Sequence, residues 1–505
     1  MLMWKIAWRN IWRHKAKSLV IGVILFLGAF LMTVGNGMID GAKKGLEDNM
    51  INSLTGHLIV LSEAEKKDDV LFTQKTVEVI PNYQEIKLLL EEQNYIEGIL
   101  PLTRGNAMVL TDTTEPGFLF LMGVNFEEFQ QVFPETLSVV EGDFLQPGER
   151  GLMVPKSSRE QLYDFNGFWL IPKDGTLNEA NLSADALAQK DTLSIKEELV
   201  VMGFSGDGLE SDILAPVKGI VKFKNLDAAW DGLVFLDLES SREAFGYVTA
   251  ADSEVELTAN QEAALDLDNL EDLFGEGDMV EASETTETAY DLEAMQQETV
   301  RTETEIDLDS GAYNMVTIKL KPGISVKDGK QMLQQAFADA GVSAKVVDWK
   351  QAAGEVAQLA TISQGALFVF VLFIFFVAGI IIMNTLSMTA IERVSELGMM
   401  RAIGARKAFV GSMFFAETAL LSIFFGGLGI LVGVVAVWVI AGIGIDTTAN
   451  DIVGLLAGGD TLNPIITSSG FVLGFIQLAI VTVLAMIYPM RVATKITPLE
   501  AISRD

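Results

Sequence analysis

Four long apolar stretches constrain this chain more than any other feature of its sequence. They lie at 19–39, 364–386, 408–443 and 469–489, and each is long enough to cross a bilayer, which takes about 20 apolar residues. The first follows a basic start, as in a signal peptide, but it is longer than the usual apolar core and no Ala-x-Ala site follows it. We therefore expect four transmembrane helices, the first of them retained.

The third stretch is the least regular of the four. Its 36 residues exceed one simple span, and several glycines lie near its middle. The basic C-terminal tail favours one long or tilted span, because two spans would place that tail outside; whether the span is broken stays open. Gly429 and Gly433 form a Gly-x-x-x-Gly pattern that lets helices pack closely. Glu417 is a functional candidate because it is ionisable, unless it lies near the interface, hydrated or capped by a neighbour.

The charges between these stretches predict the orientation of the chain. Residues 1–18 carry five bases and no acid, further bases lie in the loop 387–407 and the tail 490–505, and 444–468 carries three aspartates and no base. The positive-inside rule places both termini and the 387–407 loop in the cytoplasm. We expect a multi-pass protein of the cytoplasmic (inner) membrane, with 40–363 and 444–468 on the periplasmic or extracellular side.

Residues 1–18 contain two stripes at helical spacing. The stripes are Trp4, Trp8 and Trp12 and, one residue later, Lys5, Arg9, Arg13 and Lys17. An amphipathic helix in the cytoplasmic interface explains both, because tryptophan favours the headgroup boundary and bases attract anionic lipid. We interpret Trp4, Trp8, Trp12, Arg9 and Arg13 as interfacial anchors. A core helix of a soluble domain is the weaker alternative, since an apolar span follows directly.

Residues 40–363 form the predicted outer domain. Apolar or β-branched runs beside turn residues predict strands, and amphipathic segments predict helices. The predicted strands are 56–63, 117–124, 198–205, 233–238 and 314–320, and the predicted helices are 82–93 and 326–341. These elements do not follow a strict β-α-β order, so the predicted fold is a membrane protein of four transmembrane α-helices with a large α+β extracytoplasmic domain between the first two.

The segment 251–309 has an unusual composition within that domain. It holds 20 acids and a single base. A segment of this composition cannot bury enough apolar surface to fold alone, so we predict a disordered insertion. A Ca²⁺ loop beginning at Asp266 is the alternative, but the fifth and sixth positions are Leu270 and Glu271 where an EF-hand needs a ligand and a glycine. We therefore predict no specific metal site.

The rest of the composition argues against catalysis by this chain. The net charge is −32, cysteine is absent and only two histidines occur, which disfavours nucleic-acid binding, thiolate metal sites and histidine chemistry. The motifs of P-loop ATPases, serine hydrolases and zinc proteases are all missing from the sequence. We expect a non-catalytic membrane subunit that binds no cofactor itself.

The segment "ERVSELGMMRAIGARKAFVGSMFFAETALL" (392–421) is the most specific part of the sequence. It is a short charged cytoplasmic turn between two spans, with more charge than a passive hairpin needs. It resembles the signature of FtsX-like ABC transporter permeases, the MacB-type or type VII family. The tail "YPMRVATKITPLEAI" and the start "WRNIWRHKAKS" resemble the ends of the same family, and lipoprotein-releasing permease subunits are the most similar members.

The resemblance implies an assembly and a mechanism. Members work as dimers with a second copy or paralogue, above two ABC ATPase subunits that bind ATP and Mg²⁺. Residues 387–407 would be the coupling helix that docks on the ATPase. The family is thought to act by mechanotransmission, in which ATP hydrolysis moves the outer domains, rather than by transport through a pore. The coupling candidates are Glu392, Arg393, Glu396, Arg401 and Gly404. The alternative is that these charges only orient the chain, which leaves the acids unexplained.

Three functions remain open under this resemblance. The first is lipoprotein release from the inner membrane to a periplasmic acceptor, with lipid or another amphiphile as substrate. The second is export of peptides or small amphiphiles. The third is an FtsX-like activation of a cell-wall hydrolase, which the large outer domain disfavours because such proteins tend to have small ones.

Overall fold

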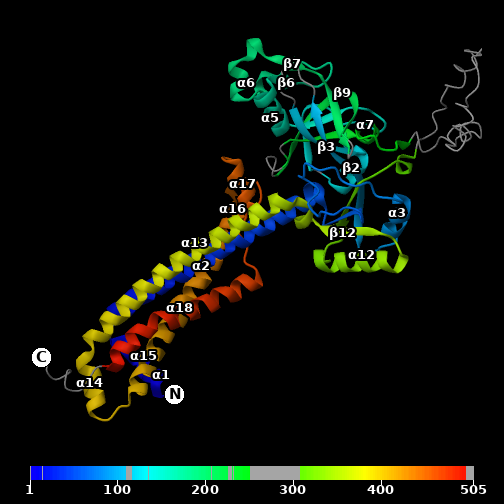
Figure 1. The fold of residues 1–505 in the computed structure, drawn as a ribbon. Helices are drawn as coiled ribbons and strands as arrows, with labels where there is room; N and C mark the ends of the chain where they lie inside the picture. The colour runs from blue at the N-terminus through cyan, green and yellow to red at the C-terminus, as the bar shows by residue number, and fades with distance from the viewer. Residues whose placement is uncertain are drawn as a thin grey trace, which may run out of the picture. The chain divides into compact units, whose positions relative to one another are not determined.

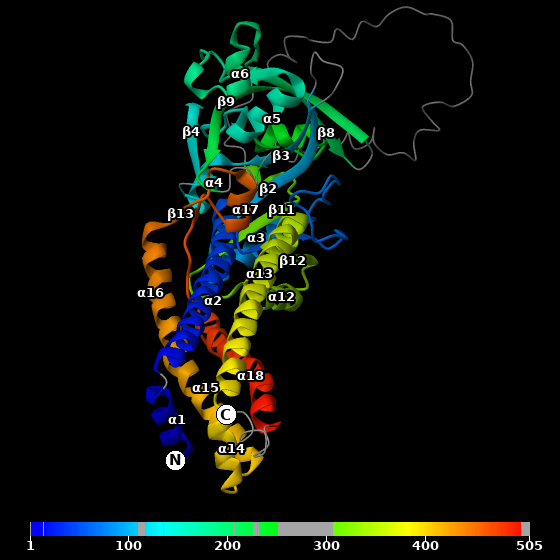
Figure 2. The ribbon, with the colours of Figure 1, turned by 90° about the vertical axis from the view of Figure 1, so that its left-hand side faces the viewer.

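The computed structural model describes residues 2–13, 15–109, 117–134, 136–205, 208–225, 230, 232–250 and 307–495. It divides the chain into a helical unit (Met1–Leu54, Phe223–Trp230 and Ala353–Asp505) and a sheet unit (Thr55–Lys222 and Asp231–Ala352), both drawn in Figures 1 and 2. The predicted disordered insertion lies outside the described residues, apart from its last three positions. The tail beyond Lys495 also lies outside them.

The helical unit contains the predicted spans. Its helices are α1 (Leu2–Arg13), α2 (Lys15–Met50), α13 (Trp349–Glu392), α14 (Val394–Ala402), α15 (Lys407–Leu421), α16 (Gly427–Ile443), α17 (Asp451–Ala457) and α18 (Ser468–Lys495). In the described part of the chain, four stretches are long and apolar enough to cross a membrane: Ser18–Thr55, Gln364–Glu392, Lys407–Ile443 and Ser468–Lys495. The prediction of four spans is confirmed.

The third stretch stays helical along its whole length. A π-helical turn, η7 (Ser422–Gly426), joins α15 directly to α16, so the residues between them are all helical. Such single turns are how a helix absorbs an irregularity without ending. The 37 residues of Lys407–Ile443 therefore form one continuous helical stretch.

Small residues bring α2 and α16 into close contact. A Cβ atom on Gly429 would lie 2.4 Å from the carbonyl oxygen of Phe26, and one on Gly433 would lie 2.8 Å from Cβ of Thr33. By contrast, a Cβ on Gly427 would meet nothing within 4 Å. Close backbone approach of this kind is how helices pack when lipid competes for every apolar side chain.

The interior of the bundle is mainly apolar but holds buried hydrogen bonds. Residues of α2, α13, α15, α16 and α18 form one apolar core. Within it, the Asn36 side chain donates to Oε1 of Gln477 at 2.9 Å, and the hydroxyls of Ser422 and Thr482 lie 2.6 Å apart. Pairing satisfies polar groups that would be costly to leave unpaired in hydrocarbon.

α2 extends well beyond its predicted end at residue 39. Its polar extension is contacted by α17 and by the short strand β14 (Thr461–Leu462), which pairs with β13 (Ile445–Asp446). Asn49 donates to the carbonyl of Gly458 at 2.6 Å, and Gly41 leaves room for the backbone at Asn463. The 444–468 segment, expected to be a loop, is thus an ordered cap on this helix.

The sheet unit is an α+β domain, as predicted. Its main sheet has ten strands within the described residues: β1 (Leu58–Ser62), β2 (Ile96–Val109), β3 (Gly117–Val124), β4 (Leu137–Gly142), β5 (Leu152–Pro155), β8 (Glu198–Ser205), β9 (Gly208–Phe223), β10 (Leu233–Asp237), β11 (Met315–Leu320) and β12 (Ala344–Asp348). Their order is β12-β1-β11-β2-β3-β10-β5-β9-β4, with β8 paired to β2 and β9.

Helices cover this sheet and a small second sheet adjoins it. The helices are α3 (Tyr83–Glu91), α4 (Phe126–Val132), α5 (Lys156–Asn166), α6 (Ala184–Ala188), α7 (Leu238–Ala244) and α12 (Val326–Ala340), and the small sheet pairs β6 (Phe168–Leu170) with β7 (Ser194–Lys196). α12 ends as its sequence predicts, because Gly341 adopts φ 69° and its N–H bonds back to Ala338.

A cluster of ionisable side chains lies between α3 and α4. Lys87 donates to the carboxylate of Asp309, and the hydroxyl of Tyr313 lies 3.2 Å from the other oxygen of that carboxylate. Burial, and next the Asp309 carboxylate, raise the pKa of the nearby Glu128 carboxyl. Hydrogen bonding to Asp309 raises the pKa of Lys87.

Candidate functional site

The turn between α13 and α15 is built around a short helix with one apolar face. Val394, Leu397 and Gly398 of α14 are buried. Val394 and Leu397 belong to an apolar cluster that joins α13, α14, α15 and α18: Ala390, Val394, Leu397, Val410, Met413, Phe414 and Ala493. α14 is therefore packed through its apolar face against the helices on either side of it.

The opposite side of α14 is exposed. Met399 has 59% of its surface exposed and Ile403 has 84%. Gly404 ends the turn with φ 103°, a conformation that favours glycine, and its N–H bonds to the carbonyl of Arg401 at 3.1 Å. We call this exposed surface the turn rim. It consists of the exposed residues Glu392, Met399, Ile403 and Gly404 and the half-exposed residues Glu396 and Arg401.

A buried ion pair connects the turn to α15. Nη1 of Arg393 donates to both carboxylate oxygens of Glu417, at 3.0 and 2.9 Å. The two side chains are only 7% and 10% exposed, and Nε of Arg393 has no hydrogen-bond partner among the described residues. Removing either partner would leave a buried, uncompensated charge. Arg393 thus differs from the other coupling candidates, because its guanidinium faces the inside of the turn.

A second, exposed ion pair connects α14 to α1. Nη2 of Arg13 lies 3.6 Å from Oε1 of Glu396, with 69% and 42% of the side chains exposed. Such surface pairs contribute about 0–1 kcal/mol. Because α1 also packs on α15, the N-terminal helix and the turn form one connected structure at this end of the helical unit.

The exposed face of α1 presents the predicted anchors. Trp8 and Trp12 are 51% and 55% exposed, with ring centroids 6.3 Å apart, and the Lys15 ammonium lies 5.0 Å from the Trp12 ring. Arg9 is also exposed, whereas Ala7 is fully buried. The side chain of Trp4 lies outside the description. This arrangement leaves an aromatic and basic face open to a membrane surface.

Residues 368–498, which include the turn and the last three spans, match the family "FtsX-like permease C-terminal". MacB, the macrolide export ATP-binding/permease protein of Psychrobacter cryohalolentis, is 31% identical over 129 residues, 26% of this chain and 17% of that protein. The ABC transporter permease YtrF of Bacillus subtilis is 29% identical over 134 residues, 26% of this chain and 30% of that protein.

This part of the chain therefore carries the C-terminal domain of FtsX-like permeases, and relatives that match it include ABC transporter permeases. An uncharacterized ABC transporter permease of Methanocaldococcus jannaschii is 26% identical over 143 residues, which cover 34% of that protein. The matches therefore span well under two thirds of the relatives' own lengths. All of these alignments cover about a quarter of this permease.

Two solved outer domains were also found by structural comparison. The extracellular domain of the transporter YknZ covers 58% of this permease at 12% identity with a TM-score of 0.24. The periplasmic region of MacB from Actinobacillus actinomycetemcomitans covers 61% at 10% identity with a TM-score of 0.27. At these scores neither likeness bears on the fold of the sheet unit.

The structure of the permease relates two residues that the sequence singled out separately. Glu417 was a candidate because it is an acid in an apolar span, and Arg393 because it lies in the turn. The structure shows them as one pair, so Glu417 is capped by a neighbour. Sequence analysis did not predict the Asn36–Gln477 bond, because an isolated amide in a helix does not indicate its partner.

Proposed function

We propose that this permease couples ATP hydrolysis by ABC ATPase subunits on other polypeptides to movement of its outer domain. The turn rim docks on the ATPase from the cytoplasm, and the buried Arg393–Glu417 pair transmits displacement of α14 to α15. One observation supports this most directly: α14 exposes one face while its other face is fixed to the spans by an apolar cluster and an ion pair. A short lever that is rigidly attached at one face suits mechanotransmission.

The assembly we propose is a dimer of permeases, with a second copy or a paralogue, on two ATPases that hold ATP and Mg²⁺. Both termini and the turn lie in the cytoplasm and the sheet unit lies outside. The exposed tryptophans and bases of α1 hold the N-terminus in the cytoplasmic interface.

The substrate we propose is a lipoprotein, extracted from the inner membrane and passed to a periplasmic acceptor. A second candidate is export of small amphiphiles, supported by relatives that are named macrolide exporters. The interior of the helical unit favours either over transport of a polar solute through a pore, because its core is apolar and two of its buried polar contacts, Asn36–Gln477 and Ser422–Thr482, are side-chain pairs.

Charge reversal on the turn rim tests the coupling. The permease is reconstituted in lipid nanodiscs with its ATPase, and ATP hydrolysis is measured with and without the permease. Glu396→Lys and Arg401→Glu should abolish the stimulation with little change in stability, because both residues are half-exposed and neither belongs to the apolar cluster beneath the turn. Arg491→Glu, an exposed base at the end of α18, is the matched control. Full stimulation in both rim variants would remove the coupling hypothesis.

Gentle purification identifies the cargo. Mass spectrometry of the solubilised complex should detect an ABC ATPase together with acylated proteins if lipoproteins are released. An ATPase with small amphiphiles and no acylated protein would favour the second candidate. A peptidoglycan hydrolase without any amphiphile would contradict both.

A further inference from the structure

The sheet unit ends at a strand with an open edge. β4 is the last strand in the order of the main sheet, and it pairs with β9 on one side. No strand among the described residues pairs with its other side. Ser138 and Val139 in the middle of β4 are exposed. An edge of this kind presents unpaired backbone N–H and C=O groups, which readily accept another strand.

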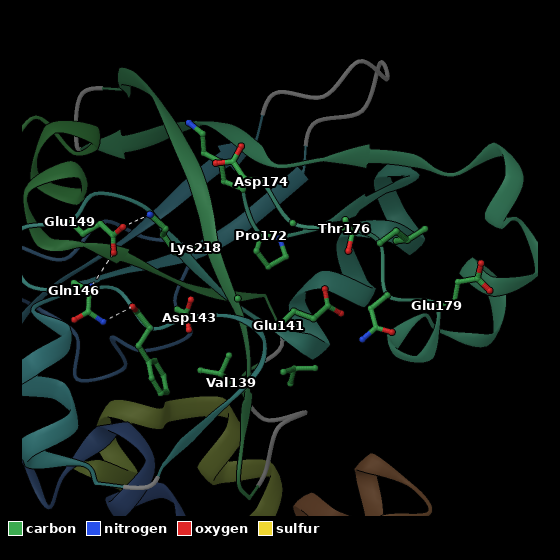
Figure 3. Close-up of a pocket in the computed structure, with 17 residues that line it drawn as sticks. Val139, Glu141, Asp143, Gln146, Glu149, Pro172, Asp174, Thr176, Glu179 and Lys218 are labelled. Atoms are coloured by element: carbon green, nitrogen blue, oxygen red, sulfur yellow. Dashed lines mark hydrogen bonds and ion pairs between the residues drawn. The ribbon is translucent and has the colours of Figure 1, made fainter.

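A wide cavity is lined in part by the last residues of β4. Its volume is about 960 Å³, at the upper end of the size of ligand pockets in general. One wall is β4 with the residues that follow it, from Val139 to Glu149, and the other is the segment from Pro172 to Glu179. Figure 3 shows Val139, Glu141 and Asp143 on one side and Pro172, Thr176 and Glu179 on the other. The cavity is therefore bordered by the strand that ends the main sheet.

The lining of the cavity is acidic. It contains five carboxylates and two lysines: Glu141, Asp143, Glu149, Asp174 and Glu179, with Lys173 and Lys218. Three carboxylates are already engaged, since Glu141 accepts from Arg159, Glu149 accepts from Lys218, and Glu179 accepts from Lys190. Those of Asp143 and Asp174 have no side-chain partner among the described residues. The cavity thus keeps negative charge that its own bases do not neutralise.

The spacing of these carboxylates does not suit a metal ion. In the described part of the chain, no three acidic or histidine side chains converge closely enough to hold one. Carboxylates distributed along a groove suit a longer ligand whose positive charges are also distributed along its length. The open strand edge on the same wall then indicates what kind of ligand it is.

We propose that the β4 edge binds an extended polypeptide segment with basic side chains, by strand addition. The backbone of the segment pairs with the free edge of β4. Alternate side chains point into the cavity, because side chains of a strand alternate between its two faces. Main-chain hydrogen bonds give affinity independent of sequence, and the carboxylates of Asp143 and Asp174 select for lysine or arginine. This site is separate from the coupling turn and does not depend on the function proposed above.

Binding of defined peptides to the full chain in nanodiscs tests the proposal. The probe is a short fluorescent peptide of alternating valine and arginine, and the readout is the dissociation constant from fluorescence anisotropy. Two further peptides serve as controls: one with glutamate in place of arginine, and one with N-methyl groups on the amides of one edge. We expect each change to weaken binding at least about tenfold, because the first reverses the charge and the second removes several hydrogen bonds.

Variants of the chain locate the site. Asp143→Asn and Asp174→Asn should each weaken binding of the arginine peptide by about two- to fivefold at low salt, the range for partly exposed ion pairs. Asp212→Asn, an exposed aspartate of β9 that does not line the cavity, is the matched control. Equal binding of the N-methylated peptide would exclude strand addition. Unchanged binding in the Asp143 and Asp174 variants, or no saturable binding to any peptide, would also overturn the proposal.

Discussion

The buried Arg393–Glu417 pair leads to a prediction whose magnitude follows from its burial. The two side chains are 7% and 10% exposed and make two hydrogen bonds of 3.0 and 2.9 Å. Water therefore screens them very little. Replacing Glu417 by glutamine leaves the Arg393 guanidinium buried without its counter-charge. Breaking a buried pair in this way costs about 3–5 kcal/mol, and Glu417→Gln should lower the free energy of unfolding by an amount in that range.

The double variant separates the ion pair from simple loss of packing. Arg393→Met with Glu417→Leu removes both charges and keeps comparable volume. We expect it to cost less than either Arg393→Met or Glu417→Leu alone, since replacing a whole buried pair by apolar groups is often neutral or stabilising. The three variants and the wild type form a double-mutant cycle, whose failure of additivity measures the interaction between the two side chains.

The assay is unfolding in mixed micelles, in which rising dodecyl sulfate denatures the permease and tryptophan fluorescence reports the transition. Arg491→Gln is the control for loss of a single exposed base, and a change within about 0.5 kcal/mol is expected for it. The reasoning fails if Glu417→Gln falls in the same narrow range as this control. It also fails if the cost of the double variant equals the sum of the two single costs.

Three further predictions follow from contacts elsewhere in the chain. Gly429→Val should lower the free energy of unfolding by about 1–3 kcal/mol in the same assay, because its side chain would collide with α2, whereas Gly427→Ala should leave it nearly unchanged. Arg13→Glu alone should lower the free energy of unfolding by at most about 1 kcal/mol at low salt, because the pair is exposed. Adding Glu396→Arg, which exchanges the two charges, should restore most of that loss. The pKa of the Glu128 carboxyl is raised in the folded state, so the folded state binds this proton more tightly than the unfolded state does. The free energy of unfolding therefore falls as the pH rises from the pKa of the unfolded state through the raised pKa of the folded state. Glu128→Gln should therefore raise the free energy of unfolding at pH 7 relative to wild type, more than it does at pH 4, and the opposite order would refute this.

The long apolar runs and the short regular strands could be predicted from the sequence. A span needs only length and apolar composition. The strands at 117–124 and 198–205 coincide with β3 and β8, because their apolar runs end close to turn residues. In such segments the local pattern and the tertiary environment agree, which is when sequence reasoning is most reliable.

The longest strands could not be predicted in the same way. β2 contains Pro101, Arg104 and Gly105, residues that interrupt an apolar pattern. It tolerates them because its first half pairs with β11 and its second half with β3 and β8, so it connects two parts of the sheet. Arg104 is fully buried within it, where its guanidinium donates to three backbone carbonyls between Leu71 and Lys75. Backbone acceptors carry no sequence signal, so this burial could not be foreseen.

The turn shows where a stronger inference from sequence was possible. An acid inside an apolar span requires a cation or a proton, so Glu417 alone predicts that one base of the preceding turn faces inward. The bases available were Arg393, Arg401, Arg406 and Lys407. Arg393 is the one that pairs: it is the single residue between α13 and α14, and its side chain is buried against Glu417 of α15. Which base faces Glu417 depends on how α14 packs against the apolar cluster beneath it, and that packing is tertiary information. The charges of this turn thus lie in two different places: the Arg393–Glu417 pair is buried against α15, and Glu392, Glu396 and Arg401 lie on the exposed or half-exposed side.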